Sequence, residues 1–306
     1  MPELPEVETI ARGLAKRVTG DVIESVWLGR KKEPLKSPAA EIAAVLERSR
    51  IESVRRMGKH IIFDLDRVGR APSPANGRAS ARTRKGSRKV SVSQSAEAAV
   101  GACPTHISAQ WIVHLGMTGR LQVCSPDAEV VKHTHAILKL TSGRELRFVD
   151  PRRFGRLSVA ADGDFAAVGV EPLDVDLDRF VALFRGRQTP IKSALLNQKL
   201  LRGVGNIYAD ESLFRAGIRP RRKAASITRE RLGKLFVSIK EVLKEAIKLG
   251  GSSISDYVDA DGEEGFFQLK HRVYSREAEP CLVCKTPIKR IVIAGRSSHF
   301  CPKCQK

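Results

Sequence analysis

The chain begins Met1-Pro2-Glu3-Leu4-Pro5-Glu6-Val7-Glu8-Thr9, a stretch that places prolines and acidic side chains at the start of a predicted helix. Proline suits the first turn of a helix, and acids suit its N-terminal end. When Met1 is removed, Pro2 becomes the chain terminus, and an α-amino group has a pKa of about 7.7–8.0. Such an amine can attack an electrophilic sugar carbon and form an iminium. The stretch is therefore either a plain helix start or one that carries a nucleophile.

Two glutamates, Glu3 and Glu6, lie within one turn of this helix. Carboxylates so close to an amine can move protons for its chemistry. The apolar residues that follow recur at helical spacing and predict a helix from Glu3 to about residue 18, ending before a glycine. They are Val7, Ile10, Leu14 and Val18.

The charge of the chain predicts a polyanionic partner. Lys and Arg number 54 against 34 Asp and Glu among 306 residues, which gives a net charge of +20. Nucleic acid is the simplest partner for this excess, with a merely basic cytosolic protein as the alternative. The sequence contains neither a run of 18 apolar residues nor an apolar signal segment, so we expect no membrane partner and a cytoplasmic location. The length is sufficient for two domains.

The first half of the chain has the pattern of strands and the second half that of helices. Many short strands, with a helix that starts at Ser37-Pro38, predict a β-sandwich or barrel-like first domain. Four helices are predicted to follow, the last of them stopped by Gly250-Gly251. The predicted strands cover 21–30, 51–57, 60–65, 110–115, 119–124, 135–141 and 144–149, and the predicted helices cover 178–185, 190–197, 207–216 and 228–249.

Two segments interrupt this pattern. Residues 67–104 are rich in Ser, Ala, Gly, Arg and Lys, which predicts a disordered basic insertion in a hairpin loop. The insertion either adds non-specific attraction to phosphates or is inert. Residues 159–177 are acidic and contain Gly and Pro, so we expect an interdomain connector there. The first domain would then cover 1–158 and the second would begin at 178.

Four cysteines near the C-terminus predict a metal site. Cys281 and Cys284 form one CxxC pair, Cys301 and Cys304 form another, and sixteen residues separate the pairs. Such pairs make a tetrahedral thiolate site for zinc, and four sulfur ligands leave no position open for catalysis. Disulfides are the alternative, which a reducing compartment disfavours. We expect one structural Zn²⁺ in a β-hairpin, with His299 on the hairpin surface.

A glycine-rich connector precedes the third predicted helix of the second half. The residues Leu201-Arg202-Gly203-Val204-Gly205-Asn206 end where the helix at Ile207 begins. Exposed amides at a helix N-terminus can bind a phosphate, although any Gly-rich helix connector has this pattern.

Five motifs, in order along the chain, resemble formamidopyrimidine-DNA glycosylase, a family also called 8-oxoguanine-DNA glycosylase or AP lyase. The resemblance covers nearly the whole chain apart from the insertion. Leu4 in the first motif is typical of this family, whereas the sister endonuclease VIII group typically has Gly there. The motifs are MPELPEVET at 1–9, HLGMTGRL at 114–121, DPRRFG at 150–155, GVGNIYADESLF at 203–214 and GRSSHFCPKCQ at 295–305.

The resemblance implies an α+β fold and a DNA repair activity. The fold would be an N-terminal β-sandwich with flanking helices, a helix–two-turn–helix domain at 178–269 and a zinc-finger β-hairpin at 270–306. The activity would be a bifunctional glycosylase and AP lyase. It would excise oxidised purines, such as 8-oxoguanine and formamidopyrimidines, from duplex DNA and cleave the strand by β,δ-elimination. The family's loop for lesion recognition would correspond to 251–268.

The resemblance also implies catalytic roles. Pro2 would attack the anomeric carbon of a nucleotide flipped out of the duplex, as enzymes that act on bases require. Glu3 would protonate the sugar as its ring opens, and Glu6 would help to position the site. Lys59, at a predicted hairpin turn, would contact a phosphate near the lesion. Its plain alternative is a solvated turn lysine.

The same resemblance assigns DNA contacts. Met117, Arg152 and Phe154 would fill the space left by the flipped nucleotide, with Arg152 on the orphaned cytosine. The remaining contacts would position the duplex without reading sequence. They are His114, Asn206, Arg296 and, near the damaged base or its phosphate, Lys192.

The sequence departs from the family pattern at the long insertion and at Ser275, where the family usually has Gly and where we expect no harm. Two other functions stay open. One is a catalytically silent zinc-finger protein that binds damaged DNA, and the other is an endonuclease VIII-like glycosylase for oxidised pyrimidines. The expected partner is double-stranded DNA with oxidised purines or abasic sites. We expect a monomer with no obligate protein partner, associated with the nucleoid.

Overall fold

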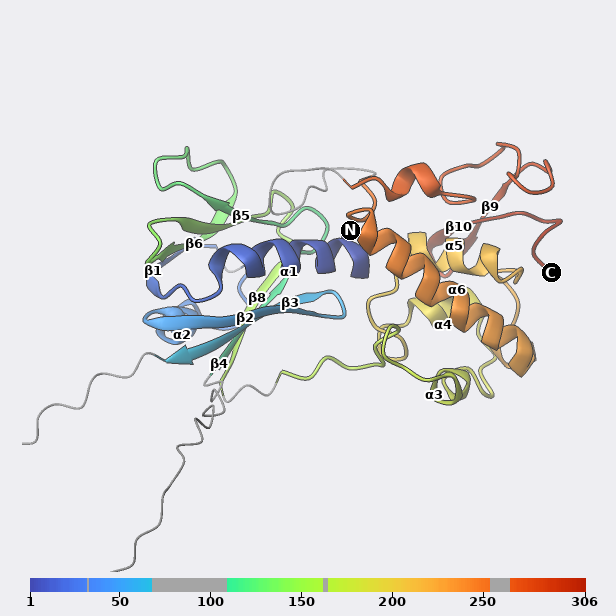
Figure 1. Cartoon of the computed structure of the whole chain (residues 1–306), viewed down its shortest axis with the longest axis horizontal. Coiled ribbons are helices and arrows are strands. Elements are labelled where there is room, and N and C mark those ends of the chain that lie inside the picture. The colour runs from blue at the N-terminus through green and yellow to red at the C-terminus, as the bar shows by residue number, and fades with distance from the viewer. Residues whose placement is uncertain (32, 68–108, 162–164, 254–264) are drawn as a thin grey trace, which may run out of the picture.

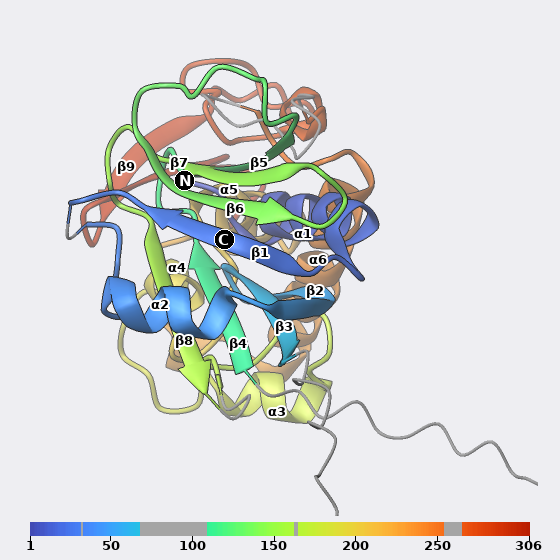
Figure 2. The ribbon, with the colours of Figure 1, turned by 90° about the vertical axis from the view of Figure 1, so that its left-hand side faces the viewer.

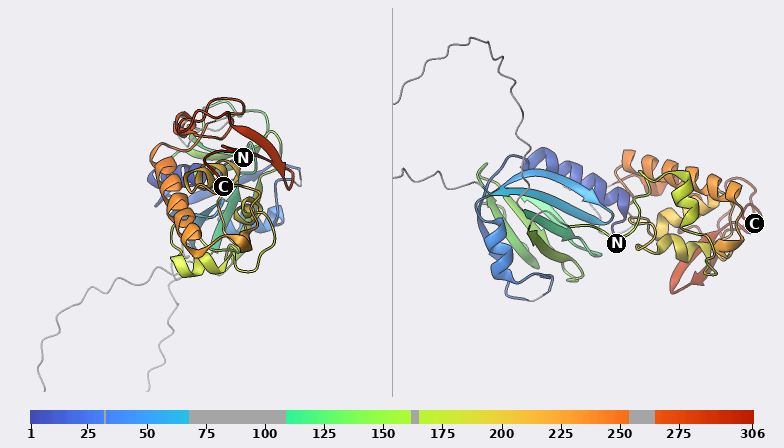
Figure 3. Two further views of the ribbon diagram at one scale, coloured as in Figure 1. Left: turned by 90° about the vertical axis from the view of Figure 1, so that its right-hand side faces the viewer. Right: turned by 90° about the horizontal axis from the view of Figure 1, so that it is seen from below.

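The computed structural model describes residues 1–31, 33–67, 109–161, 165–253 and 265–306. Figures 1 and 3 show two lobes side by side along the longest axis, with the N-terminus at their junction. The first lobe contains most of the strands and the second most of the helices. The prediction of disorder for 67–104, apart from Arg67, and the middle of the expected lesion loop lie outside the described residues. In the part of the chain that the structure does describe, no helix is long and apolar enough to cross a membrane.

The first lobe is a sandwich of two four-stranded antiparallel sheets, which Figure 2 shows one above the other. The predicted sandwich is therefore confirmed. One sheet has the order β1-β6-β7-β5 and the other β2-β3-β4-β8. The strands are β1 (Ile23–Leu28), β2 (Ser49–Met57), β3 (His60–Arg67), β4 (Ala109–His114), β5 (Arg120–Cys124), β6 (Thr134–Leu140), β7 (Glu145–Val149) and β8 (Arg156–Ala161).

Helix α1 (Leu4–Val18) runs beside the two sheets and closes the core of this lobe. The four apolar positions predicted from its spacing are all buried. At the other side of the lobe, α2 (Ala39–Leu46) buries Ile42 and Leu46 against the same core. Phe63 of β3 and Trp111 of β4 pack inside the core with ring centroids 4.8 Å apart. The apolar face predicted for the first helix is thus the face that α1 buries.

Strand β8 is absent from the sequence prediction. It pairs antiparallel with β4, from Ala109 opposite Ala161 to His114 opposite Arg156, and so continues beyond residue 158. Its sequence RLSVAA is short and leads into the acidic connector, so its pattern did not separate it from a loop. Pairing with β4, a tertiary effect, decides its conformation.

Strands β3 and β4 are neighbours in the sheet although 41 residues separate them in the chain. Leu65 lies opposite Ala109 and His60 lies opposite His114. A long segment therefore leaves and re-enters the sheet at adjacent positions, as expected for an insertion in a hairpin loop.

The second lobe is helical around its own core. The helices are α3 (Leu177–Ala182), α4 (Ile191–Leu196), α5 (Asn206–Arg215) and α6 (Arg229–Lys248), with short 3-10 turns η1 (Ala224–Ser226) and η2 (Phe267–Lys270). Thr228 caps α6, because its hydroxyl accepts a hydrogen bond from the amide of Arg231. The antiparallel hairpin of β9 (Lys289–Ile293) and β10 (Arg296–Phe300) packs on α5 through a third, small core that includes Phe214.

Replacing Ser275 by Gly is expected to stabilise the protein. Ser275 is exposed and has a φ of 58°, in the left-handed region that disfavours side chains with a Cβ. Removing the Cβ relieves this strain, and the greater freedom of glycine in the unfolded chain offsets part of the gain. We expect the free energy of unfolding to rise by about 1 kcal/mol, measured by urea denaturation. Ser275→Ala keeps the Cβ and should give no gain, so an equal gain in both variants would contradict this explanation.

Candidate active site and DNA interface

The N-terminal end of α1 inserts between the lobes, where the helical lobe holds it. The amide of Leu4 donates to the carbonyl of Gly203 at 3.0 Å. Within the helix start, the amide of Glu3 donates to Oε2 of Glu6 at 2.8 Å. Met1 is exposed to solvent and Pro2 is half-buried, whereas both glutamates are buried. The predicted nucleophile and its carboxylates therefore lie together at the junction of the lobes.

Glu3 contacts the start of α5. Its Oε1 accepts from the amide of Ile207 at 3.3 Å, and its Oε2 is buried without a hydrogen-bond partner among the described residues. Burial raises the pKa of Glu3 to about 7, and the charge of Lys59 opposes part of that rise. A Cβ at position 205 would lie 2.1 Å from Cδ of Glu3, so Gly205 is required for this close approach. Glu3 can therefore exchange a proton near neutral pH.

Glu6 joins three segments of the site. It accepts a hydrogen bond from the hydroxyl of Tyr208, and its Oε1 accepts from the amide of Ser252 at 2.7 Å. Burial raises the pKa of Glu6 as well. Gly251 has a φ of 85°, and a Cβ there would lie 2.8 Å from Glu6. Glu6 thus links the helix start to the beginning of the segment at 251–268, which suits the predicted positioning role.

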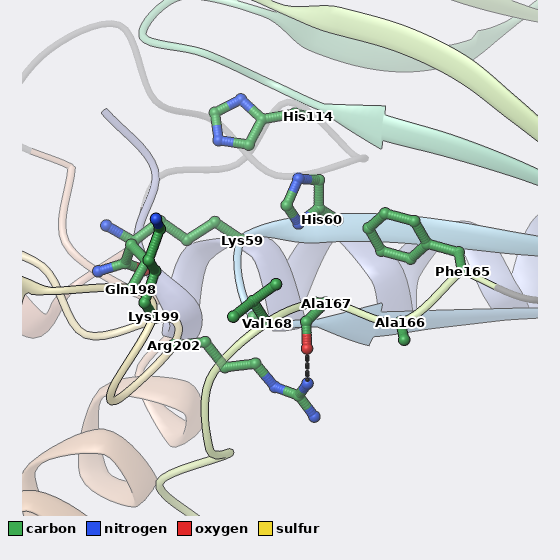
Figure 4. A pocket seen from close by; sticks show the side chains of 11 residues that line it. Lys59, His60, His114, Phe165, Ala166, Ala167, Val168, Gln198, Lys199 and Arg202 are labelled. Atoms are coloured by element: carbon green, nitrogen blue, oxygen red, sulfur yellow. Dashed lines mark hydrogen bonds between the residues drawn. The ribbon is translucent and has the colours of Figure 1, made fainter. Parts of the chain in front are cut away.

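Lys59 is located at the turn between β2 and β3, as predicted, but it is buried rather than solvated. Burial lowers the pKa of Lys59, while the charges of Glu3 and Glu6 act in the opposite direction. The lysine lines a pocket of about 360 Å³ (Figure 4). His60 and His114 stand above the turn with ring centroids 5.1 Å apart.

His114 is an acceptor in this pocket. Its Nδ1 accepts from the amide of Gly116 at 3.1 Å. Burial, followed by the neighbouring His60 and Arg156, lowers the pKa of His114 to about 4. The imidazole is therefore neutral at physiological pH, and its other nitrogen can meet a phosphate only as a neutral donor.

Two loops carry Met117, Arg152 and Phe154, and the buried side chain of Asp150 joins these loops by hydrogen bonds. Oδ1 of Asp150 accepts from the hydroxyl of Thr118 at 2.6 Å, next to Met117, while Oδ2 accepts from the amide at position 155 at 2.7 Å. Met117 is 41% exposed and Phe154 is 53% exposed. The Arg152 guanidinium lies 5.0 Å from the centre of the Phe154 ring. Large apolar side chains exposed to solvent on these hydrogen-bonded loops are available to enter a base stack.

Asn206 and Arg296 come together through Ser297. The side-chain amide of Asn206 donates to the hydroxyl of Ser297 at 3.2 Å, and Arg296 is the preceding residue on β10. Both predicted phosphate contacts therefore belong to one structural unit, the start of α5 with the hairpin.

Lys192 is placed differently from its prediction as a DNA contact. Its side chain is 0% exposed, and Nζ lies 2.7 Å from Oδ1 of Asp210 while donating to the carbonyl of Ser297 at 2.5 Å. A fully buried ammonium cannot touch a duplex in this arrangement. Its contacts instead bind β10 to α4 and α5.

The prediction that His299 lies on the hairpin surface is wrong, because the residue is buried between α5 and the segment before the hairpin. Its amide donates to Oδ2 of Asp210 at 2.9 Å, and its ring lies 5.1 Å from that of Tyr274. Sequence reasoning also missed Tyr208 and Asp210, which both lie in the quoted GVGNIYADESLF motif. The available signal was an aromatic and an acidic residue on the helix that follows the glycine connector.

The four predicted cysteines form a cluster that fits a zinc ion. Their sulfur atoms all lie within 4.8 Å of one another, with 3.9 Å between Cys281 and Cys304 and 3.4 Å between Cys284 and Cys301. A tetrahedral zinc with Zn–S bonds of about 2.3 Å requires sulfur separations of about 3.8 Å. None of the four is in a disulfide. The site is therefore a structural zinc site with four thiolate ligands.

Three family models match the chain in succession. The formamidopyrimidine-DNA glycosylase N-terminal domain matches residues 1–157 and the formamidopyrimidine-DNA glycosylase H2TH domain matches residues 168–258. The zinc finger found in FPG and IleRS matches residues 278–306. The last range contains all four cysteines.

Full-length relatives and solved structures carry the same family description. A formamidopyrimidine-DNA glycosylase of Solibacter usitatus is 42% identical and one of Gluconobacter oxydans is 38% identical, each over 100% of both chains. The MutM (FPG) protein of Thermus thermophilus is 38% identical with a TM-score of 0.77, covering 99% of this chain and 98% of that one. A Lactococcus lactis Fpg in complex with abasic-site DNA is 31% identical with a TM-score of 0.80 and 99% coverage of both.

Proposed function

Since the chain belongs to the formamidopyrimidine-DNA glycosylase family, we propose that the residues gathered between its lobes excise oxidised purines and then cleave the strand. The protein is a DNA repair glycosylase, and AP lyase activity follows from the family. Its partner is duplex DNA that contains damaged purines or abasic sites, the kind of DNA in the Lactococcus lactis complexes. We also propose that the protein acts in the cytoplasm, in association with the nucleoid.

Removal of Met1 leaves Pro2 as a secondary amine with one free electron pair. In our proposal that pair attacks C1′ of the flipped nucleotide, the bond from C1′ to the purine breaks, and the proton that the amine loses goes to the departing purine. Glu3, in its protonated form, gives a proton to the sugar ring oxygen as the ring opens. The product is an iminium between Pro2 and the sugar. The buried position of Glu3, with its pKa near 7, supplies the acid that this step needs.

The iminium then acidifies the hydrogen on C2′ of the sugar. Loss of that proton expels the 3′ phosphate, and a second elimination expels the 5′ phosphate. Glu6 holds the helix start in place through Tyr208 and Ser252 while these steps proceed. Water then adds to the iminium carbon and releases the sugar fragment from Pro2, which leaves a gap of one nucleotide.

The DNA contacts divide into two groups. In the proposal, Met117 and Phe154 enter the stack beside the lesion, and Arg152 bonds the cytosine left without its partner. The phosphates on either side of the lesion lie on Lys59 and His114 from the first lobe and on Asn206 and Arg296 from the second. Lys192 supports this second group by holding β10 against α5.

The observation that carries the proposal is the insertion of the α1 start, with buried Glu3, between the lobes. The test uses protein whose loss of Met1 has been verified by mass spectrometry. We expect it to cleave a duplex with 8-oxoguanine opposite cytosine and to form a covalent adduct with the DNA when borohydride is added. Pro2→Gly, which replaces the secondary amine with a primary one, should slow both the cleavage and the formation of the adduct.

Two results would contradict the proposal. Binding of the lesion duplex without cleavage or adduct would indicate a catalytically silent DNA-binding protein. Cleavage of a thymine glycol duplex much faster than of the 8-oxoguanine duplex would indicate an enzyme for oxidised pyrimidines.

A further inference from the structure

A network of buried and half-buried charges joins the two lobes beside the Lys59 turn. Nε of Arg56, on β2, donates to Oε2 of Glu8 at 2.7 Å, and Nη2 donates to Oε1 of Glu171 at 2.7 Å. On the other side of that carboxylate, Nε of Arg202 donates to Oε2 at 3.1 Å. The side chains of Arg56 and Glu171 are only 7% and 8% exposed, so water and salt screen their pairing weakly.

The network also contacts the backbone on both sides of the lobe junction. Nη1 of Arg56 donates to the carbonyl of Gly58 at 3.2 Å, directly before Lys59. Nη1 of Arg202 donates to the carbonyl of Ala167 at 2.7 Å, the bond drawn below the pocket in Figure 4. Glu171 therefore connects the hairpin turn of the first lobe with the connector and the glycine-rich turn of the second.

Each segment that carries the chemistry begins close to a member of this network. Lys59 follows Arg56 by three residues, and Asn206 follows Arg202 by four. Glu8 follows Glu3 by five residues on the same helix. Each of the three segments therefore has a member of the network within five residues, through which a shift of the Glu171 carboxylate would be passed on.

Stability alone does not account for such a network. Removing charges from water costs as much free energy as their pairing commonly returns, and well-packed apolar side chains can replace buried ion pairs without loss. A carboxylate bonded by two guanidinium groups from different lobes does fix direction and distance, because each guanidinium is planar and donates in a set geometry.

We propose that Glu171 is a positioning residue for the reaction, which rests on the function proposed above. By pairing with Arg56 and Arg202 together, it sets the Lys59 turn and the Glu3 segment of the first lobe against the Asn206 segment of the second. Glu171 is only 8% exposed and pairs with two guanidinium groups, so in this inference it acts through them and not through contact with DNA or the reacting atoms. Its removal should therefore slow the covalent step more than it weakens DNA binding.

Glu171→Gln tests this directly, because glutamine has the same shape but cannot bind two guanidinium groups as an anion. We expect single-turnover excision of 8-oxoguanine at saturating protein, and borohydride trapping, to slow by about 10²-fold, the cost of a misplacement of about 1 Å. The dissociation constant for a duplex with a reduced abasic site should change less than the rate. Thermal unfolding and zinc content are measured for each variant, so that rates are compared only between folded, zinc-loaded proteins.

Asp64→Asn is the matched control for a merely structural effect. Asp64 is as buried as Glu171 and accepts from Arg55 at 2.7 and 3.0 Å and from Gln110 at 2.8 Å, but all these partners lie in one sheet. We expect this variant to lose stability and to keep the wild-type single-turnover rate. Equal slowing by Glu171→Gln and Asp64→Asn would overturn the inference.

Arg202 supplies a second test that leaves Arg56 and Glu171 paired, so the fold is retained. Arg202→Gln should slow trapping by about tenfold, and Arg202→Lys, which keeps the charge but lacks the planar donor geometry, should recover only part of the loss. Trapping at the wild-type rate by both Arg202 variants would overturn the inference. Failure of the wild-type protein to cleave or trap would instead overturn the proposed function, so the two failures are distinguishable.

Discussion

Glu3→Gln is expected to lower excision of 8-oxoguanine by about 10²–10⁴-fold at pH 7, the usual contribution of a placed acid–base group. Glutamine keeps the shape of Glu3 and can still accept from the amide of Ile207, so the helix start should remain in place. It cannot deliver a proton to the opening sugar. Single-turnover excision at saturating protein measures the loss.

The pH dependence provides the sharper part of this prediction. Because burial raises the pKa of Glu3 to about 7, the acid form declines above that pH. The wild-type rate should then fall by about tenfold per pH unit, and this decline should be missing in the variant. A decline near pH 7 that persists in Glu3→Gln would assign it to another group. Glu41→Gln, at the start of α2 and exposed, is the control and should match the wild type.

The same carboxyl group makes stability depend on pH. The folded pKa of about 7 lies above the unfolded value of 4.5, so between these values the folded state binds more protons. Stability is therefore lost as the pH rises from about 4.5 to 7, by up to roughly 3 kcal/mol. Glu3→Gln should remove this loss and be more stable than the wild type above pH 7. Urea denaturation at pH 5 and pH 8 measures the difference.

Loss of zinc is expected to weaken binding to lesion DNA by at least about 10²-fold. The hairpin core consists of few side chains, among them Phe214, Val273 and Ile288, which is too little apolar surface for an independent fold. Structural zinc supplies roughly 10–16 kcal/mol of folding free energy in isolated zinc fingers. Without it the hairpin should unfold, taking Arg296 away from Asn206.

Cys301→Ser and exhaustive chelation should have the same effect on anisotropy of a labelled abasic-site duplex. Cys124→Ser is the control, since Cys124 lies in β5 outside the cluster. Zinc-free protein that binds the duplex as tightly as the zinc form would contradict the expected role of the metal.

Periodicity and spacing were sufficient where a local pattern decided the structure. The apolar face of α1, the two CxxC pairs and the hairpin turn at Lys59 lie where the sequence predicted them. The predicted β-sandwich, helical second half and zinc hairpin are confirmed. The catalytic and DNA-contacting roles of individual residues stay predictions.

Contacts between distant segments could not be predicted from a single sequence. Arg56 and Glu171 are 115 residues apart, and Glu6 and Tyr208 are 202 apart, with no local pattern that relates them. Burial of Lys192 and His299 depends on Asp210, which faces both from α5. A lysine and a histidine are predicted to be exposed when only the sequence is known. Only the contact with Asp210 shows that both can be buried.

Because Leu65 pairs with Ala109, the end of the β3–β4 hairpin is a suitable insertion site for a foreign segment. From the Lys59 turn, β3 runs for eight residues before the chain leaves the sheet, a path of about 26 Å at the usual rise of a strand. A fluorescent reporter or an affinity handle could replace residues 68–108 there while the two strands keep their register. Single molecules of the enzyme could then be followed along DNA with their chemistry left intact.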